Sequence, residues 1–324
     1  MISYRAFEMH CHTQHSDGKF TLQELLDAAC AYGFAGICLT DHNTSSGIRQ
    51  LPEVDSRGLL VVPGIEWTTF FGHLLVLGCS RYVDWRTVQP DTIDTALREI
   101  RRAGGVSGVA HPFELGAPLS CGSHWDFQVK DWSLVDYMEV WSGDAPHRRL
   151  KNQLALSFYD GLLSKGHRLA LTAGRDWHGP DGKTRPIVSA TYLGIENGPI
   201  RANSVLRAIR MGRTYVTVGP ELALSVWKNG TSFQIGDTIP AGTVHVSFKT
   251  KETEGKTAWG NNGAQPQEMR VIINGANAWM SQIGQTQAEF SLDVPKGWMR
   301  MEVWGMLENE WNRLALTSPF YIET

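Results

Sequence analysis

Histidines stand at the ends of short apolar runs, where a strand would give way to a loop. Six of the 11 histidines in this chain of 324 residues follow the pattern: His10, His12, His42, His73, His111 and His178. The carboxyl ends of the strands in an α/β barrel face one mouth, where active sites are built. Histidines that are remote in the sequence would therefore meet there. One histidine at a strand end is usually structural, but six together predict a metal site.

Three carboxylates accompany these histidines. Asp17 follows His12 by five residues, Glu66 ends the run PGIEW, and Asp176 stands two residues before His178. Imidazole nitrogens and carboxylate oxygens without thiolates favour zinc, manganese or iron in a catalytic site. The predicted metal ligands are His10, His12, Asp17, His42, Glu66, His73, His111, Asp176 and His178.

The spacing of these residues suggests more than one ion. His10 and His12 would point to the same face of a strand, because side chains alternate with a period of two, and this pair can chelate one metal. One carboxylate shared between ions would hold them about 3.5–4 Å apart, the spacing of hydrolytic metal clusters.

We expect four catalytic residues: Glu66, Asp176, Arg175 and His15. Glu66 and Asp176 would hold the ions. His15 lies between predicted ligands and could act as an acid near the leaving group or as a donor behind the ligands. Arg175 could clamp an anionic substrate with two hydrogen bonds, or it could pair with a neighbouring carboxylate. The sequence leaves both pairs of alternatives open.

Strands and helices alternate through the first two hundred residues. Helical spacing and capping signals predict helices over 21–32, 92–103, 148–165 and 204–211, the first with a Thr21–Glu24 capping box and a stop at Gly33. Apolar runs suited to buried strands include FAGICLTDH, GLLVVPGIEW, HLLVLG, GVSGVAHPF, LVDYMEVWSG and HRLALTAG. This alternation implies a parallel sheet that closes, or nearly closes, into a barrel.

The pattern changes after Val218-Gly219-Pro220. Short alternating strands separated by Gly, Asn and Pro turns follow, such as ELALSVWKNG, EMRVIING and GWMRMEVWG. This pattern is typical of a small antiparallel β-sandwich. We therefore expect a metal-binding barrel at 1–219 and a C-terminal β-sandwich domain at 220–324.

Six segments, in order, resemble the motifs of the PHP (polymerase and histidinol phosphatase) superfamily: HCHTQHSDG, LTDHN, PGIEW, GHLLVLG, VAHPF and GRDWHG. The junction GRTYVTVGP and the trailing β domain resemble its CehA/McbA-like branch. Two positions depart from the usual pattern, Arg175 before the last Asp and Ser142 in Glu-Val-Trp-Ser-Gly. The departures concern the substrate rather than the metal core.

The resemblance implies a distorted seven-stranded (β/α) barrel with two or three divalent ions. Carried over by position, His10, His12, Glu66 and Asp176 would hold the first ion. Glu66 would bridge to a second ion held by His73 and His111. Asp17, His42 and His178 would hold a third.

The composition restricts partners and location. A net charge of −3 with scattered lysines and arginines does not favour nucleic-acid binding. No apolar run approaches the length of about 18 residues that a membrane span needs, and no apolar segment follows Met1. Five cysteines without a Cys-x-x-Cys pair predict reduced thiols. We expect a cytoplasmic protein that acts on a small, anionic molecule, and homo-oligomerisation stays open.

Hydrolysis of a small phosphomonoester or phosphodiester by a bridging hydroxide is the leading hypothesis, because metal coordination lowers the pKa of water towards about 7. A carbamate, ester or amide hydrolase with the same metal cluster is the alternative. A non-catalytic metal-binding accessory domain is a third interpretation, which the complete set of nine ligand positions disfavours.

Overall fold

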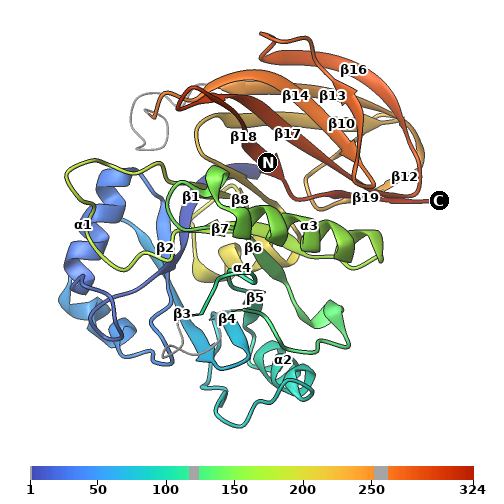
Figure 1. The fold of residues 1–324 in the computed structure, drawn as a ribbon. Helices are drawn as coiled ribbons and strands as arrows, with labels where there is room; N and C mark the ends of the chain where they lie inside the picture. The colour runs from blue at the N-terminus through green and yellow to red at the C-terminus, as the bar shows by residue number, and fades with distance from the viewer. Residues whose placement is uncertain (1, 117–123, 252–261) are drawn as a thin grey trace.

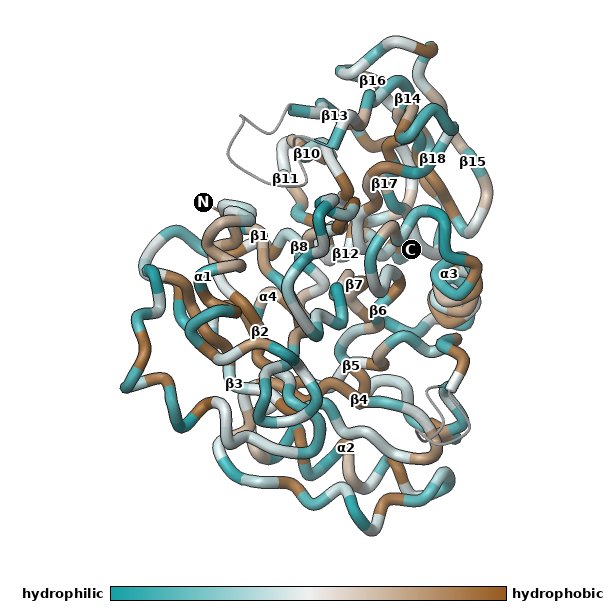
Figure 2. Tube along the Cα trace, turned by 60° about the vertical axis from the view of Figure 1, so that its left-hand side comes forward, coloured by the Kyte–Doolittle hydropathy of each residue, from teal (hydrophilic) through white to brown (hydrophobic). Residues whose placement is uncertain are grey.

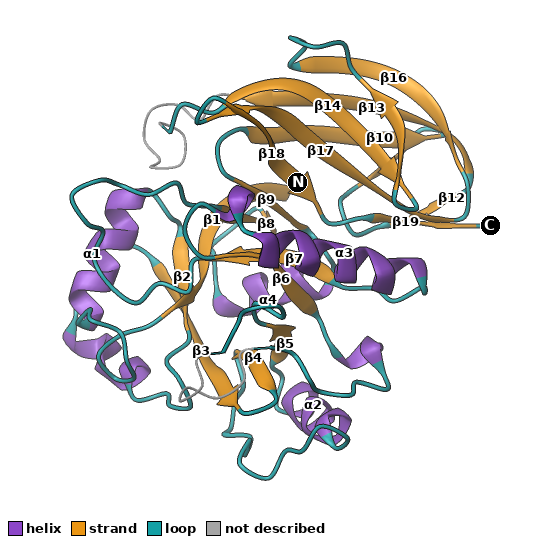
Figure 3. Ribbon diagram, in the orientation of Figure 1, coloured by secondary structure: helices purple, strands orange, loops and turns teal. Residues whose placement is uncertain are grey.

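The computed structural model describes residues 2–116, 124–251 and 262–324. The N-terminal part combines strands with helices, whereas the C-terminal part is built from strands (Figures 1 and 3). The β-rich part lies against one side of the α/β part, above it in Figure 1. Because the predicted site residues all belong to the α/β part, its strands are described first.

Seven strands of the α/β part pair in chain order. They are β1 (Ile2–Cys11), β2 (Gly36–Leu39), β3 (Leu60–Thr69), β4 (Gly72–Leu77), β5 (Val106–Val109), β6 (Tyr137–Ser142) and β7 (Ala170–Gly174). Neighbouring strands are parallel except at β4, which is antiparallel to both β3 and β5. The prediction of a uniformly parallel sheet is therefore wrong at β4. A two-residue turn, with no helix, joins β3 to β4 and reverses the chain.

The barrel closes between the end of β1 and Trp177, which stands three residues after the end of β7. The His12 N–H donates to the Trp177 carbonyl at 2.9 Å, and the Trp177 N–H donates to the His10 carbonyl at 3.0 Å. These two hydrogen bonds join the end of β1 to the segment after β7. The seven strands thus form the distorted barrel that the sequence predicts, closed at the end that carries the histidines.

Four helices accompany these strands: α1 (Leu22–Tyr32), α2 (Ile93–Arg102), α3 (Leu150–Ser164) and α4 (Ala202–Arg210). All four predicted helices are confirmed to within about two residues. Both hydrogen bonds of the predicted capping box open α1, and Gly33 ends it with a φ of 89° that a glycine adopts without strain. Three short 3-10 helices complete the set: η1 (Gly47–Glu53), η2 (Trp132–Leu134) and η3 (Pro146–Arg148).

Helix α4 closes the end of the barrel opposite the histidines. Its buried residues Val205, Leu206 and Ile209 belong to the same apolar cluster as Val62 and Val106, which lie at or near the beginnings of β3 and β5. Figure 2 shows brown, hydrophobic stretches along the inner strands, including β2 and β4, and teal stretches in many outer loops. Apolar side chains therefore fill the end of the barrel next to α4, and the polar site residues lie at the opposite end.

Two further strands, β8 (Ala190–Glu196) and β9 (Thr214–Thr217), are not among the strands predicted from the sequence. Strand β8 is antiparallel to β1, and β9 is antiparallel to β8. Strand β9 also pairs with β18 of the C-terminal part, with Leu316 opposite Val216. The sheet of the barrel therefore continues by hydrogen bonds into the β-rich part. The domain boundary after residue 219 stays a prediction.

Ten strands form the C-terminal part over the residues that the structure describes. They are β10 (Glu221–Lys228), β11 (Thr231–Phe233), β12 (Thr238–Pro240), β13 (Gly242–Lys251), β14 (Gln265–Ile273), β15 (Ala276–Met280), β16 (Gln287–Val294), β17 (Gly297–Leu307), β18 (Glu310–Thr317) and β19 (Phe320–Glu323). Strands β11, β10, β13 and β16 form one sheet, and the others join the sheet that continues from the barrel. Every pair among them is antiparallel except β12 and β19.

The two sheets of this part share one apolar core. Buried residues alternate along β13, and Val244, Val246 and Phe248 belong to the same cluster as Val271 and Val303 of the other sheet. This alternation is expected of two sheets packed face to face. The predicted β-sandwich is thus what the C-terminal strands form.

Two further expectations concern the whole chain. Four cysteines, Cys11, Cys30, Cys38 and Cys79, carry free thiols, and Cys121 lies outside the described residues. Among the described residues, no helix has the length and apolar character needed to cross a membrane.

An ion-pair network links the β-rich part to α3. Glu302 of β17 is 1% exposed and accepts from Arg300 at 2.8 Å and from Arg313 at 2.9 Å. Arg300 also pairs with Asp160 of α3. Burial raises the pKa of Glu302, but the two guanidinium groups outweigh this effect and lower it to about 2. Glu302 therefore stays ionised where an ordinary glutamate would take up a proton.

We predict that Glu302→Gln lowers the free energy of unfolding at pH 7 by roughly 3 kcal/mol. The reason is that the folded state stabilises the ionised Glu302 carboxylate relative to the unfolded state. The depressed pKa stabilises the wild type above about pH 4.5, and this contribution is lost as the pH falls towards 2. The variant should therefore lose less stability than the wild type over that interval. Urea unfolding at several pH values measures both. Glu310→Gln is the control, since the Glu310 carboxylate is 60% exposed. Parallel pH curves for Glu302→Gln and wild type would contradict the prediction.

Candidate metal centre

The nine predicted ligands come from strand ends that share one mouth of the barrel. His10 lies at the end of β1, Glu66 near the end of β3, and His111 just after β5. His73 instead stands near the beginning of β4. Because β4 runs antiparallel to its neighbours, its beginning reaches the same mouth as their ends.

The deepest group combines His10, His12, Glu66 and Asp176, whose ligand atoms lie within 4.8 Å of one another. His10 Nε2 is 3.1 Å from Glu66 Oε2 and 3.3 Å from Asp176 Oδ1. His12 Nε2 is 3.4 Å and 3.0 Å from the same two atoms. Two imidazole nitrogens and two carboxylate oxygens thus converge on one point.

A second group shares Glu66 with the first. His73 Nδ1 lies 2.9 Å from Glu66 Oε1, and His111 Nε2 lies 3.1 Å from the same oxygen. The first group uses Oε2 of this carboxylate and the second uses Oε1. Glu66 is therefore placed to bridge two ions, as the resemblance implied.

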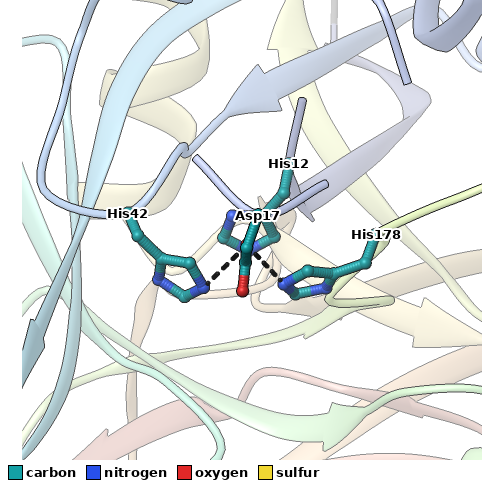
Figure 4. Close-up of side chains that lie close together, drawn as sticks. All are labelled: His12, Asp17, His42 and His178. Carbon is teal, nitrogen blue, oxygen red and sulfur yellow. Dashed lines mark ion pairs between the residues drawn. The ribbon is translucent and has the colours of Figure 1, made fainter. Parts of the chain in front are cut away.

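A third group lies nearer to solvent and contains His12, Asp17, His42 and His178. Asp17 Oδ1 is 3.3 Å from His42 Nε2 and 3.1 Å from His178 Nε2 (Figure 4). Figure 4 shows the Asp17 side chain between the two imidazoles. The Asp17 carboxylate is 61% exposed, so this group opens towards solvent, unlike the other two.

The charges in this cluster compensate one another. Burial raises the pKa of Glu66, but His10, His111 and His42 outweigh it and lower that pKa well below its ordinary value. Burial lowers the pKa of His42, but Asp17 and Glu66 raise it to about 10. Hydrogen bonds from His178 and His42 hold the pKa of Asp17 below its usual range. The carboxylates are therefore anionic, as metal ligands must be.

The cluster passes a test of fit for divalent ions. Among the described residues, His10 Nε2 and Glu66 Oε2 have no hydrogen-bond partner, although both side chains are fully buried. Buried polar atoms without a partner are costly, and a cation between them would satisfy both. The donors are nitrogen and oxygen only, which suits zinc, manganese or iron. The three groups are thus candidate sites for metal ions.

Two buried glutamates orient the ligands. Glu139 of β6 lies 3.1 Å from His10 Nδ1 through Oε1 and accepts from the His111 N–H through Oε2 at 3.1 Å. Glu8 accepts from the backbone N–H groups of His10 and Arg175, at 3.0 and 2.8 Å. Such partners fix the orientation of ligating imidazoles. Glu8 was not predicted from the sequence, although Glu8 and His10 share one face of β1.

Asp41 accepts hydrogen bonds from the loop that follows β1. Its Oδ1 accepts from the Thr13 N–H at 2.7 Å and from the Ser16 hydroxyl at 3.0 Å. The segment that carries Asp17 is thereby held over the end of β1.

Two ligands have an unusual backbone conformation. His111 has a φ of 24° and Asp176 a φ of 54°, where side chains other than glycine are uncommon. Residues held in such conformations concentrate at functional sites, where the surrounding structure imposes them. Here the neighbouring hydrogen bonds of Glu139 to His111 and of Glu8 to Arg175 provide that restraint.

The two remaining predicted catalytic residues lie outside the three groups. His15 Nδ1 lies 2.9 Å from the Ser46 hydroxyl, and its Nε2 is buried without a hydrogen-bond partner among the described residues. Arg175 pairs with Asp144 at 2.6 Å and with Asp181, and its guanidinium lies over the Trp177 ring. These contacts correspond to the second alternative for Arg175, pairing with neighbouring carboxylates.

A cavity of about 500 Å³ opens beside the metal ligands Asp176 and His178. Three basic residues line it besides Arg175: Lys19, Arg149 and Lys151. Lys151 pairs with Glu114 at its edge. A pocket of this size suits a small molecule.

We predict that Gly174→Ala weakens metal binding about 10- to 100-fold, the usual cost of disturbing a residue that orients a ligand. A Cβ at this position would lie 2.2 Å from Glu139 Oε1 and 2.5 Å from the His10 Cβ, so that one of them must move. Competition with a chromophoric chelator measures the affinity. Gly161→Ala is the control, since a Cβ there meets no atom within 4 Å and should stabilise α3 by about 0.5–1 kcal/mol. Equal metal affinity in the two variants would refute the proposed packing constraint.

Comparison with known proteins agrees with this geometry. Residues 8–87 match the model of the PHP domain family. A phosphoribosyl 1,2-cyclic phosphate 1,2-diphosphodiesterase of Eggerthella lenta is 33% identical over 64 residues, 19% of this chain and 24% of the relative. The alignment thus spans about a quarter of that relative's length.

A solved structure shares the whole fold. It is a two-domain protein from Bacteroides vulgatus that contains a predicted PHP-like metal-dependent phosphoesterase, with a TM-score of 0.55 and 15% identity. The similarity covers 98% of this chain and 96% of that one. The CehA/McbA-like branch stays a prediction. Residues 8–87 of this chain thus match the PHP domain family, and the whole chain shares its fold with the Bacteroides vulgatus structure.

Proposed function

We propose that this protein is a metal-dependent phosphoesterase that cleaves a small phosphomonoester or phosphodiester. The observation that carries the proposal is the position of Glu66, whose two oxygens face two separate groups of imidazoles. A carboxylate shared in this way is the mark of multinuclear hydrolytic sites. The family match supports the proposal, as does the activity named for the Eggerthella lenta relative.

The residues of the chain provide the binding and the orientation. His10, His12, Glu66 and Asp176 would hold one ion, Glu66, His73 and His111 a second, and Asp17, His42 and His178 a third. Bound divalent ions supply Lewis-acid activation of water and neutralise charge on phosphoryl oxygens. Glu139 and Glu8 fix the ligand geometry from behind. We propose two or three ions of zinc, manganese or iron.

The cavity beside Asp176 and His178 would receive the rest of the substrate. Its volume of about 500 Å³ suits a small molecule, and Lys19 and Arg149 in its wall could contact an anionic group. His15 lies near Ser46, and we retain both of its roles, an acid near the leaving group or a donor behind the ligands. The cytoplasmic location and the oligomeric state stay predictions.

One observation keeps the carbonyl-hydrolase alternative open. The Arg175 guanidinium is already paired with Asp144 and Asp181, so it is not free to clamp a phosphate as the structure stands. A carbamate, ester or amide hydrolase would need no such clamp, and the same metal cluster could serve it.

We predict that the metal-loaded protein hydrolyses aryl phosphates or phosphodiesters, and that Glu66→Gln lowers kcat/KM more than about 100-fold with loss of bound metal, because it removes a shared ligand. Turnover of phosphate, carbamate and carboxyl-ester substrates should be measured together with metal content. Chelation should abolish turnover, and added metal should restore it. Glu53→Gln, at an exposed position, is the control. Turnover of carbamates or esters alone would favour the alternative, and metal binding without any turnover would favour an accessory domain.

A second prediction separates two roles for Arg175. We expect Arg175→Ala to lower metal occupancy and all activities by the same factor, roughly 10- to 100-fold, because the residue anchors the loop that carries Asp176. Arg175→Lys should recover part of both. Arg185→Ala is the control, since Arg185 is exposed and its guanidinium lies over the Tyr32 ring, as does that of Arg175. A loss confined to phosphate substrates at full metal occupancy would instead assign Arg175 to substrate binding.

A further inference from the structure

A second cavity of about 430 Å³ lies between α3 and the β17–β18 hairpin of the β-rich part. None of the nine metal ligands lines it. The first turn of α3 separates the two cavities, with Arg149 and Lys151 on the metal side and Asn152 and Gln153 on this side. The cavity is therefore distinct from the proposed substrate pocket, and its function does not depend on that proposal.

One wall is a face of the hairpin. Trp304 of β17 pairs with Arg313 of β18, and Met306 pairs with Trp311. Side chains two residues apart share a face, so that all four point the same way. Trp311 is 38% exposed, whereas the Trp304 ring is covered by the guanidinium groups of Arg270 and Arg313, whose carbons lie 4.2 and 4.8 Å from its centroid. Trp311 thus offers a free indole face.

The opposite wall is a polar stripe on α3. Asn152, Leu156 and Asp160 are spaced by four residues, and Gln153 and Ser157 run beside them, all lining the cavity. Residues four apart lie on one side of a helix. An amide, a hydroxyl and a carboxylate therefore face the tryptophans across the cavity.

The charges that line this cavity are already paired. Asp160 binds Arg300, and Arg313 binds Glu302 at 2.9 Å. No unpaired cation is left at this cavity to select an anion. What remains is an aromatic face with amide and hydroxyl groups, and this combination suits a neutral, polar ligand.

His147 of η3 adds an unpartnered buried group. Its side chain has no exposed surface, and among the described residues neither ring nitrogen has a hydrogen-bond partner. Nε2 lies 3.4 Å from Glu308 Oε2 without hydrogen-bond geometry. Burial holds the pKa of His147 below its ordinary value, so the ring is neutral at pH 7 and offers one donor and one acceptor. Unsatisfied groups of this kind call for a partner.

We propose that this cavity is a binding site for a neutral saccharide. A pyranose ring has an apolar face of C–H groups, which can stack on the Trp311 indole, and a rim of hydroxyls. The hydroxyls are both donors and acceptors, which matches the Gln153 amide, the Asn312 Oδ1 and the His147 ring nitrogens. The volume lies within the range of small-molecule sites.

The test is ligand-observed NMR with the full-length, metal-loaded protein and a panel of neutral sugars. The panel contains glucose, galactose, mannose, xylose, N-acetylglucosamine, cellobiose and maltose, and excess inorganic phosphate blocks the metal-side pocket. We expect at least one sugar to bind in the presence of phosphate. Trp311→Ala should raise its dissociation constant about tenfold, because aromatic stacking is lost.

Two further variants make the outcome specific. Trp227→Ala is the matched control, since Trp227 is a partly buried tryptophan of the other sheet that stacks on His245. Ser157→Trp should fill the cavity from its exposed edge and abolish binding. The proposal is overturned if no sugar of the panel binds, if phosphate displaces the bound sugar, or if Trp311→Ala and Trp227→Ala change binding equally.

Discussion

The burial of the Glu66 carboxylate sets the conditions for the rest of the N-terminal part. An ionised carboxylate taken from water into the interior costs several kcal/mol unless opposite charge and hydrogen bonds compensate it. The compensation comes from His10, His73 and His111, each contributed by a different strand, and a bound cation would complete it. The ends of β1, β3 and β5 and the beginning of β4 must therefore lie at one level around this carboxylate. The distorted barrel, with its reversed β4, achieves this.

The convergence of these side chains requires unusual backbone conformations around the cluster. His111 and Asp176 take left-handed φ values, and Gly174 leaves the space that the Glu139 and His10 side chains occupy. Hydrogen bonds from the His111 and Arg175 N–H groups to Glu139 and Glu8 stabilise these conformations. The same segment closes the barrel through Trp177. The segment that closes the barrel therefore also positions the predicted ligands Asp176 and His178.

Hydrogen bonds and ion pairs, in addition to the continuous chain, join the β-rich part to the α/β part. Strand β9 pairs with β18, and Arg300 joins Glu302 to Asp160 of α3. Because the same helix supplies Lys151 to the metal-side cavity and Asn152 to the second one, it lies between the proposed substrate site and the β-sandwich. Asn152 also binds the Ser142 N–H and carbonyl, which fixes the end of β6.

The sequence by itself determined the helices, most strands and the nine side chains at the mouth, because hydrophobic periodicity, capping residues and ligand types are local signals. It did not determine the direction of β4, strands β8 and β9, or the part played by Glu8, because these depend on which strands become neighbours. The sequence also did not determine which carboxylates pair with Arg175, since one of them, Asp144, is 31 residues away in the chain. Only the tertiary structure decides which charges meet, and a buried charge takes its role from the groups that surround it.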